Sequence, residues 1–401
     1  MSNLKNKNMF PLFILMLNLF IALLGQGMVI PILPDYLKQF NAAGTAAGYL
    51  VAAFGAAQFI FSPIGGRLSD RYGRRIMILS GLFFTVIADF IFAISHTLML
   101  LYVARIIGGV GIGIMVPSVL AYVADITTKE TRAKGMGYLS AAMNLGMVLG
   151  PGIGGMIAQL GIRIPYFFAA GLGFVATILT LILPETLPIE KRSASDTPKK
   201  QQSILEELVQ SFHKPYFRHL ILILVMTFGL VGFETVYSLF VENKYGFTSK
   251  DISILITLGA AIGIIVQIWL IDKAVKRFGE YNLIKISLLM TAIALLLMLI
   301  KINFIYLILV SSLFFTFNSL LRPTVTTLLS NEAGSDEQGF VSGLNTTYMS
   351  MGNIVGPVMA GYLFDKQINL PYILSALILG GTIFLTGERK NIANNEVISN
   401  E

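Results

Sequence analysis

The sequence contains no cysteine and only three histidines. Without cysteine the chain has no disulfide framework, no thiolate nucleophile and no cysteine-ligated metal site, and its redox compartment stays undetermined. His96, His213 and His219 lie at the edges of apolar runs, and no cluster of His, Asp and Glu has the spacing of a metal site or of a nucleophile with its base. We therefore expect neither metal nor cofactor, and an embedded enzyme or receptor is disfavoured.

Charge is also scarce, because 13% of the 401 residues are charged whereas 55% are hydrophobic. The mean hydropathy of +0.74 excludes an ordinary soluble domain, whose surface needs more charge. Apolar runs long enough to span a bilayer follow one another almost without pause. They predict an all-α integral membrane protein with twelve transmembrane helices, near residues 9–33, 45–65, 75–95, 99–121, 136–159, 164–184, 219–241, 251–271, 283–300, 304–327, 340–363 and 369–387.

The basic residues predict the orientation. The first apolar run is too long, and too soon followed by another, to be a cleaved signal peptide. The formal net charge of +7 comes from short loops, where Lys and Arg orient a membrane protein rather than bind nucleic acid. With the amino terminus inside, most of them are cytoplasmic, so both termini are expected in the cytoplasm of a cell-membrane protein. The contributors are Arg67, Arg71, Arg74, Arg75, Lys129, Arg132, Lys134, Lys273, Lys276, Arg277 and the basic residues of 185–217.

Residues 185–217 contain too few apolar residues to cross the membrane. We predict that they form a cytoplasmic linker between an N-terminal six-helix bundle, residues 1–184, and a C-terminal six-helix bundle, residues 218–401. The two parts align at a constant offset of 206 residues at three places: Arg71-Tyr72-Gly73 with Arg277-Phe278-Gly279, Pro117-Ser118-Val119 with Pro323-Thr324-Val325, and Gly146-x3-Gly150-Pro151 with Gly352-x3-Gly356-Pro357. A duplicated six-helix unit is typical of alternating-access transporters.

The loop after the second run has the sequence Gly66-Arg67-Leu68-Ser69-Asp70-Arg71-Tyr72-Gly73-Arg74-Arg75. It resembles the signature loop of the major facilitator superfamily. It is either a topology anchor or a latch whose Asp70 contact breaks as the halves rock; an acid within a basic cluster favours the latch. The conformational residues expected here are Gly66, Asp70, Arg71, Gly73 and Arg74.

The fifth run contains Gly146-x3-Gly150-Pro151-x2-Gly154-Gly155, which resembles the superfamily's antiporter motif. Glycines four apart let another helix approach closely, and the proline removes a backbone hydrogen bond. Helix packing alone would explain the glycines, whereas the complete pattern favours antiport.

An ionisable group inside an apolar run is costly and marks a candidate functional site, and we select three such residues. Glu234, in the seventh run, is the candidate proton carrier. Asp89, in the third, is either a structural partner of a neighbouring helix or a participant in coupling. Arg105, in the fourth, either reaches the outer surface or lies near the cavity and modulates a carboxylate.

Polar and aromatic residues at helical spacing suggest a cavity wall, although each of them could instead satisfy a neighbouring helix by hydrogen bonding. Together with Phe314, Phe315 and Phe317 they would form an apolar chamber with few polar groups, which suits hydrophobic cations. The candidate substrate-binding residues are Gln26, Phe54, Gln58, Ser140, Asn144, Glu234, Tyr237, Asn318, Asn345 and Tyr348.

The runs Val29-Ile30-Pro31-Ile32-Leu33-Pro34, Leu149-Gly150-Pro151-Gly152-Ile153-Gly154-Gly155 and Phe233-Glu234-Thr235 make the chain similar to the NorA and Bmr multidrug exporters of Gram-positive bacteria. The resemblance implies proton-driven efflux of varied, often cationic drugs such as quinolones and dyes. It also implies pocket roles for Phe54, Gln58, Arg105, Asn144, Glu234 and Asn345. Those exporters carry an aspartate shortly before the Arg-Pro pair of the tenth span, whereas here Asn318-Ser319-Leu320-Leu321 precedes Arg322-Pro323.

The expected function is drug:proton antiport by a monomer whose partners are small-molecule drugs, protons and the lipid bilayer. The rival is a transporter of one metabolite, a sugar or a polyamine, on the same scaffold. The missing aspartate leaves Glu234, with or without Asp89, as the expected coupling group, or implies a different choice of substrates.

Overall fold

The computed structural model describes residues 6–187, 204–332 and 337–386, and within these ranges the ordered elements are helices. Each predicted transmembrane run corresponds to one helix or to a helix with a short continuation. The elements are α1 (Asn6–Met28), η1 (Ile30–Ile32), α2 (Leu33–Lys38), α3 (Gly44–Tyr72), α4 (Arg74–Ile94), α5 (Leu98–Ile126), α6 (Lys129–Ile157), η2 (Ala158–Leu160), α7 (Ile164–Thr180), α9 (Ile204–Ser211), α10 (Phe217–Tyr245), α11 (Ser249–Phe278), α12 (Glu280–Leu297), α13 (Phe304–Glu332), α14 (Gln338–Lys366), α15 (Leu370–Thr382) and η5 (Ile383–Thr386).

Several helices extend beyond the apolar runs that predicted them. Of the described helices, nine are long and apolar enough to cross a membrane, two more are shorter and apolar, and α14 is 29 residues long. Helices of 29 or 30 residues, such as α6 and α11, are about 45 Å long at 1.5 Å per residue. That length matches the hydrocarbon core together with the headgroup layers. The polar ends therefore continue the helices into the interface, and the chain is a multi-pass membrane protein.

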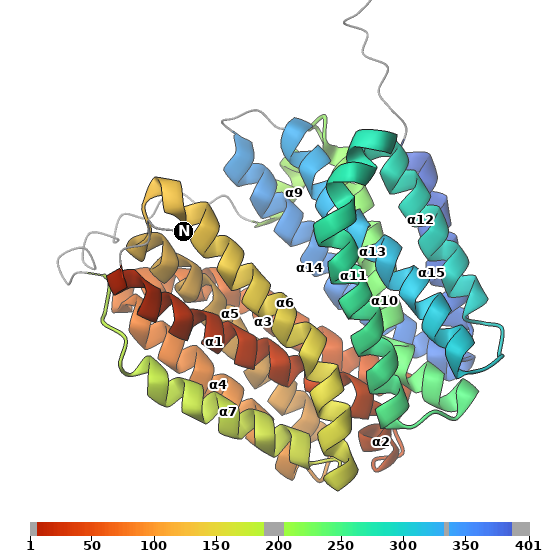
Figure 1. The fold of residues 1–401 in the computed structure, drawn as a ribbon, viewed down its shortest axis with the longest axis horizontal. Coiled ribbons are helices and arrows are strands. Elements are labelled where there is room, and N and C mark those ends of the chain that lie inside the picture. The colour runs from red at the N-terminus through yellow and green to blue at the C-terminus, as the bar shows by residue number, and fades with distance from the viewer. Residues whose placement is uncertain (1–5, 188–203, 333–336, 387–401) are drawn as a thin grey trace, which may run out of the picture.

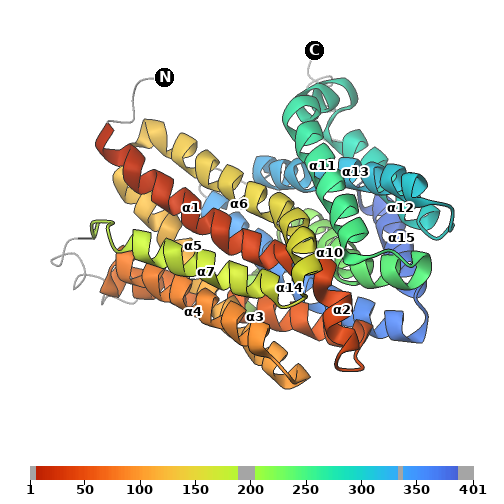
Figure 2. The same ribbon diagram turned by 60° about the horizontal axis from the view of Figure 1, so that its bottom comes forward.

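The helices form two groups that touch at one end and diverge toward the other (Figures 1 and 2). The first group contains α1 to α7, and the second contains α10 to α15. The groups meet at the end where α2 lies, which we call the α2 end. The opposite end, where the second group begins with α10, is called the linker end. The helices of the two groups are therefore in contact at the α2 end and lie farther apart at the linker end.

Two helix pairs close the α2 end: α3 with α14, and α6 with α11. The α3–α14 contact joins backbone to backbone, because a Cβ added at Gly48 would lie 2.3 Å from the Pro357 carbonyl oxygen and one at Gly361 would lie 2.2 Å from the Gly44 carbonyl oxygen. In the α6–α11 contact, a Cβ at Gly155 would lie 2.4 Å from the Ser253 Cβ. Glycine permits these approaches because it lacks a Cβ.

Buried apolar side chains continue across this contact. One cluster contains Ile32, Leu33 and Tyr36 of the first group together with Val236 and Phe240 of α10. This apolar packing between the groups contributes to holding the α2 end closed. Toward the linker end, the groups no longer share this cluster.

The predicted repeat reappears in the helix bounds. The span Leu98–Ile126 of α5 and the span Phe304–Glu332 of α13 are displaced by the same 206 residues as the sequence matches. Gly73, between α3 and α4, has φ +111°, and Gly279, between α11 and α12, has φ +75°. Both turns use a left-handed conformation that favours glycine. The two groups are thus built to one plan.

The predicted linker contains a helix that the sequence reading did not anticipate, α9 (Ile204–Ser211). Its Ser211 hydroxyl lies 2.7 Å from the Tyr348 hydroxyl of α14. The basic residues expected in the linker, Lys191, Arg192, Lys199 and Lys200, lie outside the described residues, as do the two termini.

Replacing Gly48 with alanine should open the α2 end, because the added methyl group must push α3 away from α14. Overpacking of this kind costs about 1–3 kcal/mol, which corresponds to a population shift of roughly five- to 150-fold. The separation can be measured by electron–electron double resonance (DEER) between nitroxides on Gln39→Cys and Ile302→Cys. Both residues are exposed and lie in different groups, and the native chain contributes no cysteine.

The matched control is Gly171→Ala in α7, where an added Cβ meets no atom within 4 Å. It should leave the distance distribution unchanged. Equal distributions for Gly48→Ala and the unsubstituted labelled chain would contradict the backbone contact.

Candidate functional site

The space between the two groups is lined by side chains that come from both. Its part nearer the α2 end, about 280 Å³ in volume, is lined by residues that include Gln26, Phe54, Gln58, Arg105 and Glu234. Its part nearer the linker end, about 550 Å³, is lined by residues that include Ser140, Asn144, Gln267, Asn318 and Arg322, and again Glu234. Val231, Glu234 and Asn353 belong to both parts. Glu234 therefore lies where the two parts of the cavity meet.

Glu234 is the acid that this cavity presents. Its side chain is exposed to the space between the two groups. Helices of the protein surround this space on its sides, so Glu234 does not lie on the outer surface. Arg322 of α13 lies within electrostatic range of its carboxylate, and no described group donates a hydrogen bond to it. A carboxylate with a nearby cation and free lone pairs can take up either a proton or a cationic group from the cavity.

Asp89 and Arg105 lie in a small side pocket of the first group, about 30 Å³ in volume, with Gln26, Tyr166 and Phe92 among its lining residues. The Arg105 guanidinium lies over the Phe92 ring, 5.1 Å from its centroid, and 6.0 Å from that of Phe54. Asp89 is its electrostatic partner. Arg105 therefore points into the bundle, and the alternative that it reaches the outer surface is wrong.

Two polar atoms of this side pocket have no hydrogen-bond partner: the Arg105 Nε and the Tyr166 hydroxyl, both of which are buried. Arg105, Gln26, Val29 and Phe54 line both the side pocket and the main cavity. The pair of Asp89 and Arg105 is thus placed beside the main cavity, and Arg105 is the charged residue that the two spaces share.

The comparisons with known proteins agree with this architecture. The model of the Major Facilitator Superfamily matches residues 15–357 and 269–393. The chain is 42% identical over 384 residues to multidrug resistance protein 2 of Bacillus subtilis, covering 95% of this chain and 96% of the relative. It is 39% identical over 383 residues to the quinolone resistance protein NorA of Staphylococcus aureus, covering 95% and 97%. This chain belongs to the major facilitator superfamily.

Solved structures agree on the fold of this major facilitator protein. The nucleoside transporter NupG superimposes with a TM-score of 0.73 at 14% identity, over 94% of this chain and 97% of that one. The human organic anion transporter MFSD10 gives a TM-score of 0.65 at 21% identity, over 94% and 98%. These two likenesses concern the fold alone. Membership of the superfamily makes the chain a transporter rather than an enzyme.

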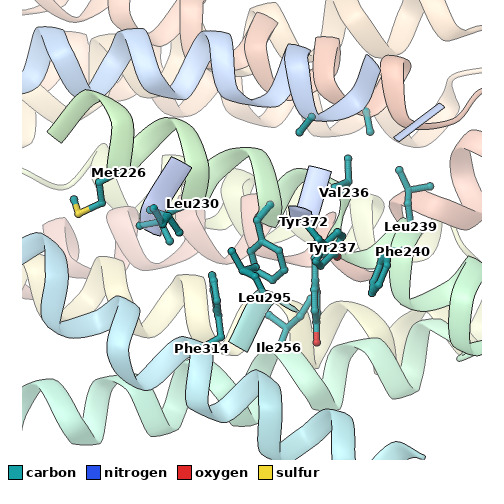
Figure 3. Close-up of a cluster of buried hydrophobic side chains, with 14 of the residues drawn as sticks. Met226, Leu230, Val236, Tyr237, Leu239, Phe240, Ile256, Leu295, Phe314 and Tyr372 are labelled. Carbon is teal, nitrogen blue, oxygen red and sulfur yellow. The ribbon is translucent and has the colours of Figure 1, made fainter. Parts of the chain in front are cut away.

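Three of the candidate binding residues lie away from the cavity of this transporter. Tyr237 is 2% exposed, and its hydroxyl lies 2.7 Å from that of Ser311; Figure 3 shows it within the buried cluster of the second group. Tyr348 is bonded to Ser211 of α9. The Asn345 Oδ1 is buried without a hydrogen-bond partner.

The prediction from helical spacing that Tyr237 lines the cavity is wrong, because the surroundings of α10 change along its length. Glu234 is exposed to the cavity, but residues 235–240 are all buried. Beyond Glu234 the helix enters the closed α2 end, where packing covers every face. Phe314 is likewise fully buried, and its ring centroid lies 4.2 Å from that of Phe233. It therefore belongs to the core and not to the expected chamber wall.

The sequence reading did not select Arg322, Gln267 and Asn353 as site residues, yet all three line the cavity. Arg322 carried a usable signal, since it is a charged residue within an apolar run, as Glu234 is. The amides carried none, because Gln and Asn also bond neighbouring helices.

The glycine motif of α6 has two faces. Added Cβ atoms at Gly146, Gly150 and Gly154 would meet the α1 carbonyl oxygens of Phe20, Leu24 and Met28 at 2.4–2.6 Å, whereas Gly155 faces α11 of the other group. One face therefore packs α6 against α1, and the other contributes to closure of the α2 end. Pro151 lies within α6 and also contacts the Gly27 region of α1.

The signature loop forms contacts inside the first group. The Arg74 guanidinium bridges Asp70 and Asp125, at 2.5 and 3.3 Å. The backbone N–H groups of Arg74 and Arg75 donate to the Glu185 carboxylate at 2.9 and 3.1 Å. Arg71 lies over the Tyr72 ring, and Gly66 is close to Pro117. The Asp70 side chain is 51% exposed at the linker end.

Among the described residues, no group of three His, Cys, Asp or Glu side chains could hold a metal ion.

Removing one charge of the Asp89–Arg105 pair should lower the stability more than removing both charges. Arg105→Gln leaves the Asp89 carboxylate without the cation that offsets the cost of its burial, so this single variant should be less stable than the native chain. In the Asp89→Asn/Arg105→Gln double variant neither charge remains, so its loss of stability should be smaller than the sum of the single losses. Thermal unfolding in detergent measures the three losses, and additive losses would show that the two charges do not interact.

Proposed function

We propose that this chain is a proton-coupled multidrug exporter of the cell membrane, which moves hydrophobic, often cationic compounds out of the cytoplasm. The observation that carries this proposal is the unbonded Glu234 carboxylate in a cavity that both halves line. The relatives named for multidrug and quinolone resistance support the choice of cargo.

The proposed moving units are residues 1–184 and residues 218–401, joined by residues 185–217. The Lys and Arg residues of the loops lie mainly at the linker end, which the positive-inside rule assigns to the cytoplasm together with both termini. The arrangement in Figure 1 then corresponds to an inward-open state. Cytoplasmic drug enters between the halves, and Gly66, Asp70, Arg71, Gly73 and Arg74 contribute contacts that rearrange when this end closes.

The coupling step follows from the charges in the cavity. With Glu234 ionised, its charge balances Arg322 and attracts a cationic drug. Proton binding at Glu234 in the outward-open state leaves Arg322 unbalanced, so the drug cation is repelled and leaves. Return to the inward-open state releases the proton to the cytoplasm. A charge crossing 100 mV supplies about 2.3 kcal/mol, enough for roughly a fiftyfold gradient of a neutral substrate.

The cavity residues have distinct proposed roles. Gln26, Phe54 and Gln58 contact the drug from the first half nearer the α2 end, and Ser140, Asn144 and Asn318 contact it nearer the linker end. Asp89 and Arg105, which lie in the side pocket, adjust the electrostatic potential in this cavity. Tyr237, Asn345 and Tyr348, whose placement separates them from the cavity, are proposed only as supports of the surrounding helices. Glycines 146, 150, 154 and 155 with Pro151 form the antiporter motif.

Glu234→Gln should abolish active efflux, because a glutamine amide of the same size does not take up a proton at physiological pH. Ethidium efflux from energised cells, with a protonophore arm, measures this. Glu234→Asp keeps the carboxyl group and should retain part of the activity. Active, protonophore-sensitive efflux by Glu234→Gln at the wild-type rate would reject Glu234 as the proton carrier.

Arg322 should distinguish classes of drug. A zwitterionic fluoroquinolone can place its carboxylate on Arg322 and its ammonium group on Glu234, whereas ethidium has no carboxylate. A hydrogen bond to a charged group is worth about 1.5–3 kcal/mol, so Arg322→Gln should weaken quinolone transport by about tenfold or more.

Ethidium transport by the same variant serves as the internal control and should fall much less. Arg322→Lys should recover part of the quinolone transport because it restores the charge without the planar fork. Equal losses for both drugs would remove Arg322 from drug recognition. Export of one metabolite and of neither drug would favour the rival transporter.

A further inference from the structure

The helix α3 begins at the α2 end without a capping side chain of its own. Its N-cap residue is Ala43, which accepts no hydrogen bond through its side chain. The first amides of a helix have no partner within the helix and require an acceptor from elsewhere. For Gly44 and Thr45, this acceptor is Asp365, near the end of α14 in the other half. Its two carboxylate oxygens lie 2.7 Å from the Gly44 nitrogen and 2.8 Å from the Thr45 nitrogen.

Three other helices that begin at the same end, α5, α11 and α13, are capped by neighbouring residues of their own half, whereas α7 and α15 have a proline in their first turn and no side-chain cap. The Thr97 side chain accepts from the Leu100 amide at the start of α5. Thr248 and Asp251 form a capping box on α11. Asn303 accepts from the Tyr306 amide at the start of α13. The helix α3 differs because its cap comes across the contact between the halves.

The surroundings make this contact specific to the closed state. The α3 and α14 backbones touch at Gly44 and Gly361, so the carboxylate of Asp365 reaches amides whose positions are fixed. The other polar contacts between the halves at this end, Lys38 with Glu242 at 2.6 Å and Asp35 with Ser249, join side chain to side chain. The Lys38 side chain is 59% exposed and that of Glu242 is 13% exposed, so this partly buried ion pair also joins the halves.

We propose that Asp365 is the positioning residue that latches the α2 end of this transporter closed, by capping α3 of the opposite half. When the α2 end opens, the carboxylate separates from Gly44 and Thr45, and α3 loses its cap. A cap is an interaction of the closed state alone, so it biases the equilibrium between the two states of the cycle. This role goes beyond the proposed function, since it holds for any cargo.

The latch can be tested with the labels on Gln39→Cys and Ile302→Cys, in protein reconstituted into lipid nanodiscs. Asp365→Ala should raise the population with a long distance between the labels by roughly two- to thirtyfold, the range expected for a lost N-cap. Asp365→Asn, which retains an acceptor oxygen but no charge, should give a smaller shift.

The matched control is Asp251→Ala. This residue is also a capping carboxylate at the same end, but it caps α11 within its own half. It should lower the thermal stability without changing the distance distribution. An Asp365→Ala distribution equal to that of the parent, or equal to that of Asp251→Ala, would overturn the latch.

A rescue variant separates the latch from simple helix stability. Ala43→Ser gives α3 a capping hydroxyl of its own. In the Asp365→Ala background it should recover thermal stability while the long-distance population stays high. Recovery of the closed distance together with stability would show that Asp365 only stabilises α3 and would overturn the proposal. These distances require no transport, so the result is independent of whether Glu234 carries protons.

Discussion

The contact of two helix backbones at one end of the molecule is the constraint on which the remaining arrangement depends. At Gly44, Gly48 and Gly361 a Cβ on any one of them would lie within 2.6 Å of the facing helix backbone. Because α3 and α14 approach so closely, the space between the halves is sealed at the α2 end and can widen only toward the linker end. The apolar cluster that crosses this contact and the Asp365 cap both require that approach. The exposure of Glu234 to the cavity is a further consequence, since α10 is covered on all sides just beyond it.

Each half also contains an acid at membrane depth with a neighbouring cation. Asp89 faces Arg105 in the first half, and Glu234 faces Arg322 in the second. A charge inside the membrane is tolerated when it is paired or reaches water. The two pairs differ in access, because the first lies in a side pocket, whereas the second lies in the open cavity. Glu234 is therefore open to the cavity directly, whereas Asp89 lies in the side pocket, which shares Arg105 with the cavity.

Much of the fold could be predicted from local sequence because lipid imposes strong rules on the backbone. Spanning segments must be helical and apolar over a fixed length, and each predicted run corresponds to a helix. The predictions failed where a side chain's partner lies far away in the chain. Tyr237 shares a helix with Glu234 and has suitable spacing, but Ser311 of α13 holds its hydroxyl in the core. Asp365 attracted no attention in the sequence, because the amides that it caps are more than 300 residues away.

The sequence by itself determined the membrane class, the positions of the spans, the duplication, and the intramembrane acids, since hydropathy, charge and a constant offset are all local or pairwise properties of the chain. Only the tertiary structure decided which end is closed, which polar residues share one cavity, that Arg105 points inward, and that Arg322 stands beside Glu234. The physical reason is that these features depend on the rotation and depth of each helix against its neighbours. The rotation and depth of each helix are set by packing contacts between residues that are far apart in the sequence and are not related by any regular spacing.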